Sequence, residues 1–379
     1  MKLFQSIFLC VLAIECGAQN PVINKRPVDL HDGINTAQMA TVGINADTIN
    51  ELTDKINAGY YPNIHSLLIY KSGYLVYENY FPGRDEKWGV STGLTKHGIN
   101  DLHDLRSVTK SVVSTCVGIA ISQGKIKSID EKVFDFFKEY DYLDTGLKKD
   151  LTIRHLLNMS SGFKWNEDVP YNNPENSEVL MTNSPDPVKY IFSQPIVKNP
   201  GAEWRYNGGT VQLLAAIIEK ATGKKLDEYA NENLFKPLGI KTFYWYKFPG
   251  TNESIAASGL RLRSRDMLKF GMLYQQNGKW QGKQIVPEAW VHHSFLKAIT
   301  VSGNVGYGYL FWKVQTQTAQ KYELDLTVAN GNGDQRIFFD DKNKLIVVVT
   351  AGNYNGAGST EKTNAQAMLK DYIYASFIK

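Results

Sequence analysis

The segment from Ser107 to Ser122 constrains the fold most, because it is small or apolar around nearly its whole circumference. Asp104 and Ser107 are N-cap candidates for a helix here, and Gly124 supplies its stop. A helix that is apolar all round lies buried rather than on a surface. The 379 residues, 43% of them hydrophobic, are enough for such a core and for more than one lobe.

Ser107 and Lys110 stand one turn apart on this helix and therefore on one face, with Cβ atoms within ~6 Å of each other. Burial disfavours the ammonium form of a lysine, and a neutral lysine can take a proton from a serine hydroxyl. The helix N-terminus at Ser107 favours a developing anion. The pattern predicts an acyl-transfer centre. The alternative is a surface lysine one turn from an N-cap serine.

The first 18 residues are typical of a secretory signal peptide. Lys2 gives a positive start to an apolar run, and Cys16 and Ala18 are small residues before a cut after Ala18. The run is too short for a stable membrane anchor. We expect secretion across the inner membrane into the periplasm. Lipoprotein anchoring through Cys16 is the alternative, and Glu15 directly before the cysteine argues against it.

Composition excludes several classes of function. The net charge of +4 is spread without a basic block, so nothing indicates a nucleic-acid partner. After loss of Cys10 and Cys16, Cys116 is a single thiol, and no intrachain disulfide is expected. The seven histidines lack zinc spacing, since His292 and His293 are adjacent and no His-Glu-x-x-His occurs. We therefore expect no metal, no cofactor and only structural histidines.

Strand patterns lie near both ends of the chain and helix patterns between them. Two hairpins are predicted, around Lys71-Ser72-Gly73 and Asp341-Lys342-Asn343. We expect an α/β (α+β) fold in which an antiparallel sheet, built from both chain ends and flanked by helices, carries an inserted helical domain. The predicted organisation is a signal peptide at 1–18, an N-terminal segment at 19–59 and one domain at 60–379. Within that domain, 60–100 and 251–379 form an α/β lobe and 101–250 a helical lobe.

Two later loops could complete a site around Ser107. Residues 199–209 are turn-rich and place Tyr206 before a strong helix pattern. Residues 331–335 carry glycines that would let backbone N–H groups approach a substrate. Taken alone, Tyr206 could pack over a helix start and 331–335 could be a hairpin loop. Residues 164–186 form a long polar loop, and such loops are often binding loops.

A competing nucleophile pattern occurs at Gly89-Val90-Ser91-Thr92-Gly93, which fits Gly-x-Ser-x-Gly. That motif requires a strand before the serine and a helix after it. Charged residues precede it here and a loop follows it, so we do not expect Ser91 to be catalytic.

From about residue 60 to the C-terminus, the chain resembles the serine hydrolases related to class C β-lactamases, penicillin-binding peptidases, family VIII esterases and 6-aminohexanoate-dimer hydrolases. Ser-x-x-Lys is their signature. The matching stretches are Asp104 to Ser111, Ile153 to Leu157, Pro200-Gly201, Trp204, Tyr206, Leu234 to Ile240, Gly259 to Leu262, Gly306 to Tyr309 and Ala329 to Gln335.

The resemblance implies that Ser107 forms an acyl-enzyme while Lys110 and Tyr206 share the general acid/base work. Matching Asn332-Gly333-Asp334 to the family's Lys/His-Thr-Gly triplet makes Asn332 and Gly333 substrate-binding residues. It also makes the backbone N–H groups of Ser107 and Gln335 the oxyanion hole.

Two departures from the family pattern narrow the predicted function. Gly208 replaces the Asn of Tyr-x-Asn, and Asn332 replaces the triplet's cation. We therefore expect a hydrolase of a small-molecule ester, amide or peptide rather than an efficient β-lactamase. The alternatives are a weak β-lactamase or DD-peptidase-like penicillin-binding protein, and an inactive binding or scaffold protein on the same fold.

Overall fold

The structure, a computed structural model, describes residues 25–318, 320–355 and 364–378. The predicted signal peptide, including the lipidation candidate Cys16, lies outside the described residues. Within the described residues, no helix is long and apolar enough to cross a membrane.

An antiparallel sheet of eight strands, ordered β10-β11-β12-β13-β14-β15-β1-β2, forms the centre of the molecule. Strands from the two chain ends meet where β1 pairs with β15, for example at Leu67 and Val349. The strands of this sheet are β1 Ile64–Lys71, β2 Tyr74–Tyr80, β10 Ile299–Ser302, β11 Val305–Gly308, β12 Phe311–Gln317, β13 Glu323–Gly331, β14 Gln335–Asp340 and β15 Leu345–Ala351. This architecture confirms the predicted fold class.

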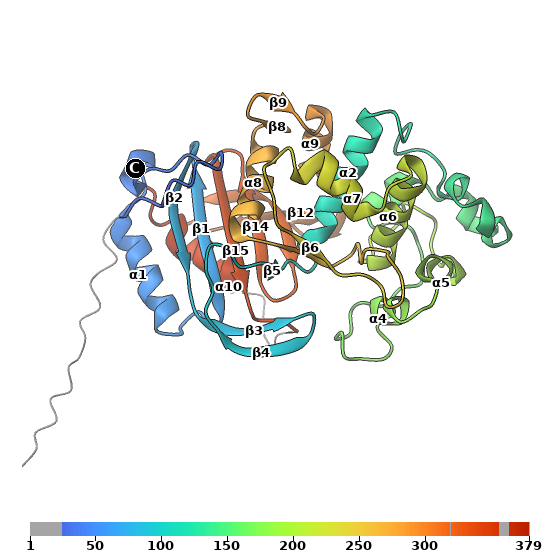
Figure 1. The fold of residues 1–379 in the computed structure, drawn as a ribbon, viewed down its shortest axis with the longest axis horizontal. Coiled ribbons are helices and arrows are strands. Elements are labelled where there is room, and N and C mark those ends of the chain that lie inside the picture. The colour runs from blue at the N-terminus through green and yellow to red at the C-terminus, as the bar shows by residue number, and fades with distance from the viewer. Residues whose placement is uncertain (1–24, 319, 356–363, 379) are drawn as a thin grey trace, which may run out of the picture.

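Smaller sheets and helices surround the central sheet (Figure 1). The short strands are β3 Gly83–Lys87, β4 Val90–Thr95, β5 His103–Asp104, β6 Tyr244–Trp245, β7 Leu260–Leu262, β8 Lys279–Trp280 and β9 Lys283–Gln284. The α-helices are α1 Ala46–Asn57, α2 Val108–Ser122, α3 Ile153–Leu157, α4 Ser177–Thr182, α5 Pro187–Ser193, α6 Gly208–Thr222, α7 Leu226–Ala230, α8 Ser264–Gln275, α9 Glu288–Ser294 and α10 Asn364–Met368. The other short helices are η1 Met39–Val42, η2 Val133–Phe136, η3 Lys138–Leu143, η4 Gly146–Asp150, η5 Asn231–Phe235 and η6 Leu369–Ile373.

The sheet separates two hydrophobic cores. Helices α1, α10 and η6 pack with one face, where residues such as Leu67 and Val349 are buried. Helix α8 covers the other face, and the core there continues into the helical part that contains α2 and α6. Figure 1 shows α4, α5 and α6 on the side of the molecule away from β1 and β2. Helix α2 lies in the core that joins the sheet to these helices, as its all-round apolar surface predicts.

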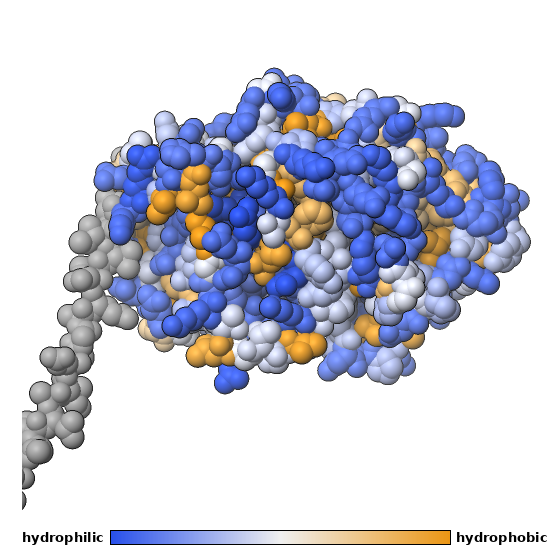
Figure 2. All heavy atoms as spheres, viewed as in Figure 1, coloured by the Kyte–Doolittle hydropathy of each residue, from blue (hydrophilic) through white to orange (hydrophobic). Residues whose placement is uncertain are grey.

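The exposed surface is mostly polar. Figure 2 shows one face on which hydrophobic residues form small patches among hydrophilic ones. Two exposed apolar side chains, Val90 and Leu94, belong to β4 of the β3–β4 ribbon. Scattered apolar residues of this kind are normal on a folded protein.

Most predicted elements are present, and the differences have local causes. The predicted hairpins are β1–β2 and β14–β15, and the predicted helix at Ser107 is α2. The segment after Phe81 forms the β3–β4 ribbon, whose charged, Gly-containing strands lack a hydrophobic alternation. The segment from Gly306 is divided into β11 and β12 by a turn at Tyr309 and Leu310, which both have positive φ. The long loop at 164–186 holds the short helix α4.

Packing around α2 yields a stability prediction for Gly118. A Cβ there would lie 2.5 Å from two ring atoms of Trp290, which is buried on α9. Alanine at a helical glycine usually gains roughly 1 kcal/mol, but overpacking costs about 1–3 kcal/mol. We expect Gly118→Ala to lower the free energy of unfolding, measured by urea denaturation, by about 1 kcal/mol or more.

Gly98→Ala is the matched control. The nearest atom to a Cβ at Gly98 is a carboxylate oxygen of Asp101 at 3.6 Å, so the free energy of unfolding should change little. An unchanged or higher stability of Gly118→Ala would contradict the packing described here.

Candidate active site

A residue with a left-handed backbone conformation, Arg106, directly precedes Ser107 at the start of α2. Strand β5 ends at Asp104, and Arg106 then has φ of 49°, which turns the chain into the helix. The Arg106 guanidinium bonds the Glu86 carboxylate at 2.5 Å and lies over the rings of Trp88 and Tyr354, at 5.1 and 4.9 Å from their centroids. Ser107 is the N-cap residue, yet its side chain makes no capping hydrogen bond. Its hydroxyl is therefore available for other contacts.

Lys110 is the buried partner of that hydroxyl. Its Nζ lies 2.9 Å from Ser107 Oγ and 2.8 Å from the carbonyl oxygen of Ala257, and only 1% of the residue is exposed. The ring centroid of Tyr206 is 4.9 Å from the same Nζ. The predicted pair is therefore assembled on one face of α2, with the amine held in place from both sides.

Tyr206 reaches the pair from the residues just before α6. Asn207 caps that helix by accepting from the backbone N–H of Thr210. The Tyr206 side chain is hydrogen-bonded to that of Ser107 and stacks on Trp312. Burial raises the pKa of Tyr206 well above its usual value, and the charge of Glu167 raises it further. Tyr206 is therefore a neutral phenol at ordinary pH.

Two glutamates that the sequence analysis did not single out lie beside these groups, Glu178 buried and Glu167 partly buried. Glu167 Oε1 accepts from the indole N–H of Trp165 and from the backbone N–H of Gly208, both at 2.5 Å. Glu178 Oε1 accepts from the Ser258 hydroxyl at 2.7 Å. The second oxygen of each carboxylate is buried without a hydrogen-bond partner in the described part of the chain.

Gly208 makes room for this acid pair. A Cβ on Gly208 would lie 2.8 Å from Glu167 Oε1 and 3.0 Å from Glu178 Oε2. An asparagine at this position, as in the Tyr-x-Asn motif, would require both carboxylates to shift. Burial and the neighbouring Glu178 raise the pKa of Glu167 to about 7, and Lys110 opposes that shift. In the sequence, the only indication of this acid pair was the long polar loop at 164–186, which was predicted to be a binding loop.

The loop at 331–335 is positioned differently from the predicted motif. The backbone of Gly331 lies against the nucleophile, since a Cβ there would be 3.2 Å from the Ser107 nitrogen and 2.3 Å from the Leu105 oxygen. Gln335 begins β14 fully buried, with its side-chain amide bonded to the backbone of Ala351. Within this loop, the backbone of Gly331 is the part that lies beside Ser107, and Gln335 is its partner across the β13–β14 ladder. The oxyanion role of the Gln335 backbone stays a prediction.

The cavity in front of Ser107 has a volume of about 350 Å³. It is lined by Glu86, Trp88, Gly89, Arg106, Ser107, Tyr171, Asn172, Glu178, Val179, Thr182, Asn183, Ser258, Asn332 and Asn355. Asn332 is among these residues, whereas Gly333 and Gln335 are not. Gly333 instead packs against the Tyr354 ring.

Ser91, the competing nucleophile candidate, lies on β4 of the exposed β3–β4 ribbon. The strand-turn-helix setting of a nucleophile elbow is not formed around it. The geometry therefore leaves Ser107 as the candidate nucleophile.

Comparison with known proteins identifies the family. The fold, together with a serine one turn from a buried lysine at a helix start, is typical of serine hydrolases related to β-lactamases and penicillin-binding proteins. The family model described as Beta-lactamase matches residues 65–370. The chain therefore belongs to the beta-lactamase family.

Individual relatives are distant. Two proteins named as provisional D-alanyl-D-alanine carboxypeptidases are 27% identical over 323 residues (Salmonella typhimurium) and 26% identical over 275 residues (Escherichia coli O157:H7). These alignments cover 82% and 69% of this chain, but 71% and 60% of the relatives. A structure named as a provisional 6-aminohexanoate-dimer hydrolase from Bacillus anthracis superposes with a TM-score of 0.68 at 19% identity, covering 84% of this chain and 80% of that one. The structural likeness shows the fold.

The raised pKa of Glu167 predicts an unusual pH dependence of stability. Its carboxyl binds a proton more tightly in the folded protein, with a pKa of about 7, than at its ordinary value of 4.5. Stability should therefore fall as pH rises from about 4.5 to 7, by up to about 3 kcal/mol from this group. We expect Glu167→Gln to lack this loss. Its free energy of unfolding, measured by urea denaturation, should therefore rise relative to that of the wild type between pH 5 and pH 8.

Glu175→Gln removes an exposed carboxyl from the same loop and should leave the pH profile of stability unchanged. If the stabilities of the wild type and of Glu167→Gln changed in parallel with pH, Glu167 would be ionised throughout this range.

Proposed function

We propose that this chain hydrolyses an ester or amide bond through an acyl-enzyme on Ser107. The observation that carries the proposal is the 2.9 Å contact between Lys110 Nζ and Ser107 Oγ, at a helix N-terminus that opens onto a cavity. An uncapped serine hydroxyl with a buried amine beside it is the arrangement that nucleophilic catalysis requires.

Lys110 is the proposed general base. In its neutral form, the amine takes the proton of the Ser107 hydroxyl as Oγ bonds to the substrate carbonyl carbon. Tyr206, kept as a phenol by its raised pKa, relays a proton to the leaving oxygen or nitrogen as the scissile bond breaks. Water then attacks the acyl-enzyme, releases the acid product and restores the serine.

The backbone supports a revised oxyanion hole. The N–H of Ser107 remains the first donor, because it lies at the helix start. We assign the second donor to the N–H of Asn332, which follows Gly331 and lines the cavity, in place of Gln335. The side chain of Asn332 exchanges two hydrogen bonds with Asn355, at 2.9 and 3.0 Å, which fixes the loop. The predicted substrate contact from this residue is therefore made by its backbone.

The charges around the cavity favour a neutral substrate. Arg106 is the only cationic side chain among the described residues that line the cavity, and it is already paired with Glu86 and stacked between rings. Glu178 adds a carboxylate that faces the same space. An anionic β-lactam, or the free C-terminus of a peptide, would find no unpaired cation among these lining residues. A neutral ester or amide does not need such a cation.

Other functions remain as alternatives. The names of the curated relatives support the alternative of a DD-peptidase-like protein with weak β-lactamase activity. An inactive scaffold protein would not need to retain the contacts among Ser107, Lys110 and Tyr206. We further propose that the chain acts in the periplasm, on the pattern of residues 1–18. Burial raises the pKa of the Cys116 thiol to about 12, so Cys116 is a poor rival nucleophile.

A fluorophosphonate probe tests the nucleophile. We expect the purified protein to be labelled at Ser107, and Ser107→Ala to take up no probe. Lys110→Ala should slow labelling on the order of 10²-fold or more, because the general base is lost. Peptide mass spectrometry after labelling locates the modified residue.

Ser91→Ala is the matched control and should label at the wild-type rate, since Ser91 lies on the exposed ribbon. Circular dichroism of each variant checks that the fold persists. Absence of labelling, under conditions that label another serine hydrolase, would support the inactive scaffold instead.

A substrate panel tests the preference for neutral substrates. We expect kcat/KM for p-nitrophenyl butyrate to exceed that for a cephalosporin by at least about tenfold, the equivalent of one lost ionic contact of about 1.4 kcal/mol. A faster cephalosporin reaction would show that the paired Arg106 still serves a substrate carboxylate.

A further inference from the structure

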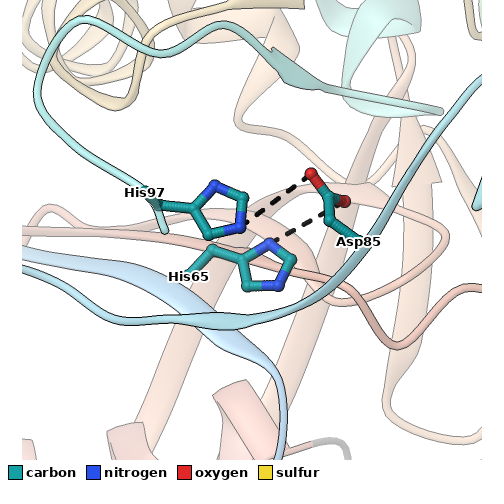
Figure 3. A group of neighbouring side chains, drawn as sticks. All are labelled: His65, Asp85 and His97. Atoms are coloured by element: carbon teal, nitrogen blue, oxygen red, sulfur yellow. Dashed lines mark ion pairs between the residues drawn. The ribbon is translucent and has the colours of Figure 1, made fainter. Parts of the chain in front are cut away.

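A second cluster of reactive side chains lies behind the candidate active site. His65 on β1, Asp85 on β3, His97 after β4 and His103 on β5 come together from four segments. Figure 3 shows His65 and His97 with ring nitrogens directed at the Asp85 carboxylate. The four side chains are 1–8% exposed. The cluster is thus enclosed by protein and separate from the cavity at Ser107.

The ligand atoms of His65, Asp85 and His97 all lie within 4.8 Å of one another. The rings of His65 and His97 stack with centroids 3.8 Å apart, so they would have to turn slightly to enclose an ion. His65 Nδ1 lies 2.8 Å from His103 Nε2 and 3.9 Å from Asp85 Oδ1. The contacts from Asp85 to His103 Nε2 and to His97 Nε2 are 3.7 and 3.9 Å. Ligands about 2.0–2.1 Å from a tetrahedral zinc lie roughly 3.4 Å from one another. The observed separations fall on both sides of that value.

The hydrogen bonds of His65 and His103 direct two ring lone pairs toward each other. His103 Nδ1 faces the Asp104 carbonyl and His65 Nε2 faces the Arg84 carbonyl, each at 3.1 Å. A carbonyl only accepts, so these two nitrogens carry the ring protons. His65 Nδ1 and His103 Nε2 then present lone pairs to each other at 2.8 Å, which is repulsive unless they share a proton or both bind a metal ion to one side of the line that joins them.

His97 and Asp85 provide the other half of the cluster. His97 Nε2 is buried and has no hydrogen-bond partner among the described residues. Asp85 Oδ1 is fixed by the backbone N–H of Glu86 at 2.8 Å and by the Tyr354 hydroxyl at 3.3 Å. The ion pairs of Asp85 within the described chain are with the three histidines. A buried carboxylate with only neutral imidazoles around it lacks a countercharge.

A proton shared among these groups is the alternative to a metal ion at their centre. Neutral imidazoles whose second N–H is held by a backbone carbonyl are the usual ligands of protein-bound zinc.

We propose that His65, Asp85, His97 and His103 bind one Zn²⁺ ion as a structural site. Three imidazole nitrogens and one carboxylate oxygen suit zinc and leave no open position for a substrate. The ion would tie β1, the β3–β4 ribbon and β5 together, and β5 leads directly to Ser107. The spacing rules used on the sequence could not find this site, because each ligand comes from a different segment.

The experiment uses the untagged full chain, stripped with a chelator and then titrated with ZnCl₂ alone. We expect one zinc per chain by elemental analysis and a melting temperature raised by roughly 5 °C at a 100-fold excess over Kd. Co²⁺ in place of zinc should give the intense visible absorption of a tetrahedral site.

His97→Gln should abolish both the melting shift and the cobalt absorption, while His292→Gln, at an exposed histidine outside the cluster, should retain both. If His97→Gln does not fold, the cobalt spectrum and zinc content of the wild type still show whether the protein binds one metal ion in a tetrahedral site. A wild-type protein that takes up neither ion and melts at one temperature with or without them would overturn the proposal. The cluster would then be a proton-sharing network.

Discussion

The buried amine of Lys110 is the group around which the rest of the molecule is arranged. An ammonium or amine that is 1% exposed is costly unless its hydrogen bonds are satisfied. Here the Ser107 hydroxyl and the Ala257 carbonyl satisfy them, and the Tyr206 ring covers a further side. These partners come from α2, from the segment before β7 and from the start of α6. Burying one side chain therefore requires the sheet and the helical part to meet at this point.

The carboxylates of Glu167 and Glu178 change the electrostatics of this centre. In the absence of a side chain at Gly208, two acids occupy the space beside Lys110 and Tyr206. Burial and the charge of Glu178 raise the pKa of Glu167, and the charge of Lys110 lowers it. Glu167 is thus electrostatically linked to the buried amine. With glycine at the third position of the Tyr-x-Asn pattern, carboxylates rather than an amide lie at this place.

Local sequence patterns predicted much of this structure. Features that depend on contacts between distant segments could not be predicted. The apolar surface of α2 predicted a buried helix, and the spacing of Ser107 and Lys110 predicted their contact. The acid pair was not predicted, because its members are eleven positions apart in a polar loop whose path depends on the whole helical part. The composition of the 331–335 loop could not tell which of its two glycines lies beside Ser107, because only the fold distinguishes Gly331 from Gly333. The histidine cluster depends in the same way on strand pairing.

The left-handed backbone of Arg106 ties the chemistry of the site to a surface hairpin. A non-glycine residue at φ of 49° costs on the order of 1 kcal/mol and persists only where its surroundings enforce it. Glu86 and Trp88, which hold Arg106 in that shape, belong to the β3–β4 ribbon and its turn. Ser107 follows Arg106 directly and therefore depends for its backbone geometry on contacts with the ribbon. Loosening of the ribbon alone, with both hydrophobic cores intact, would remove the contacts that hold Arg106 beside Ser107.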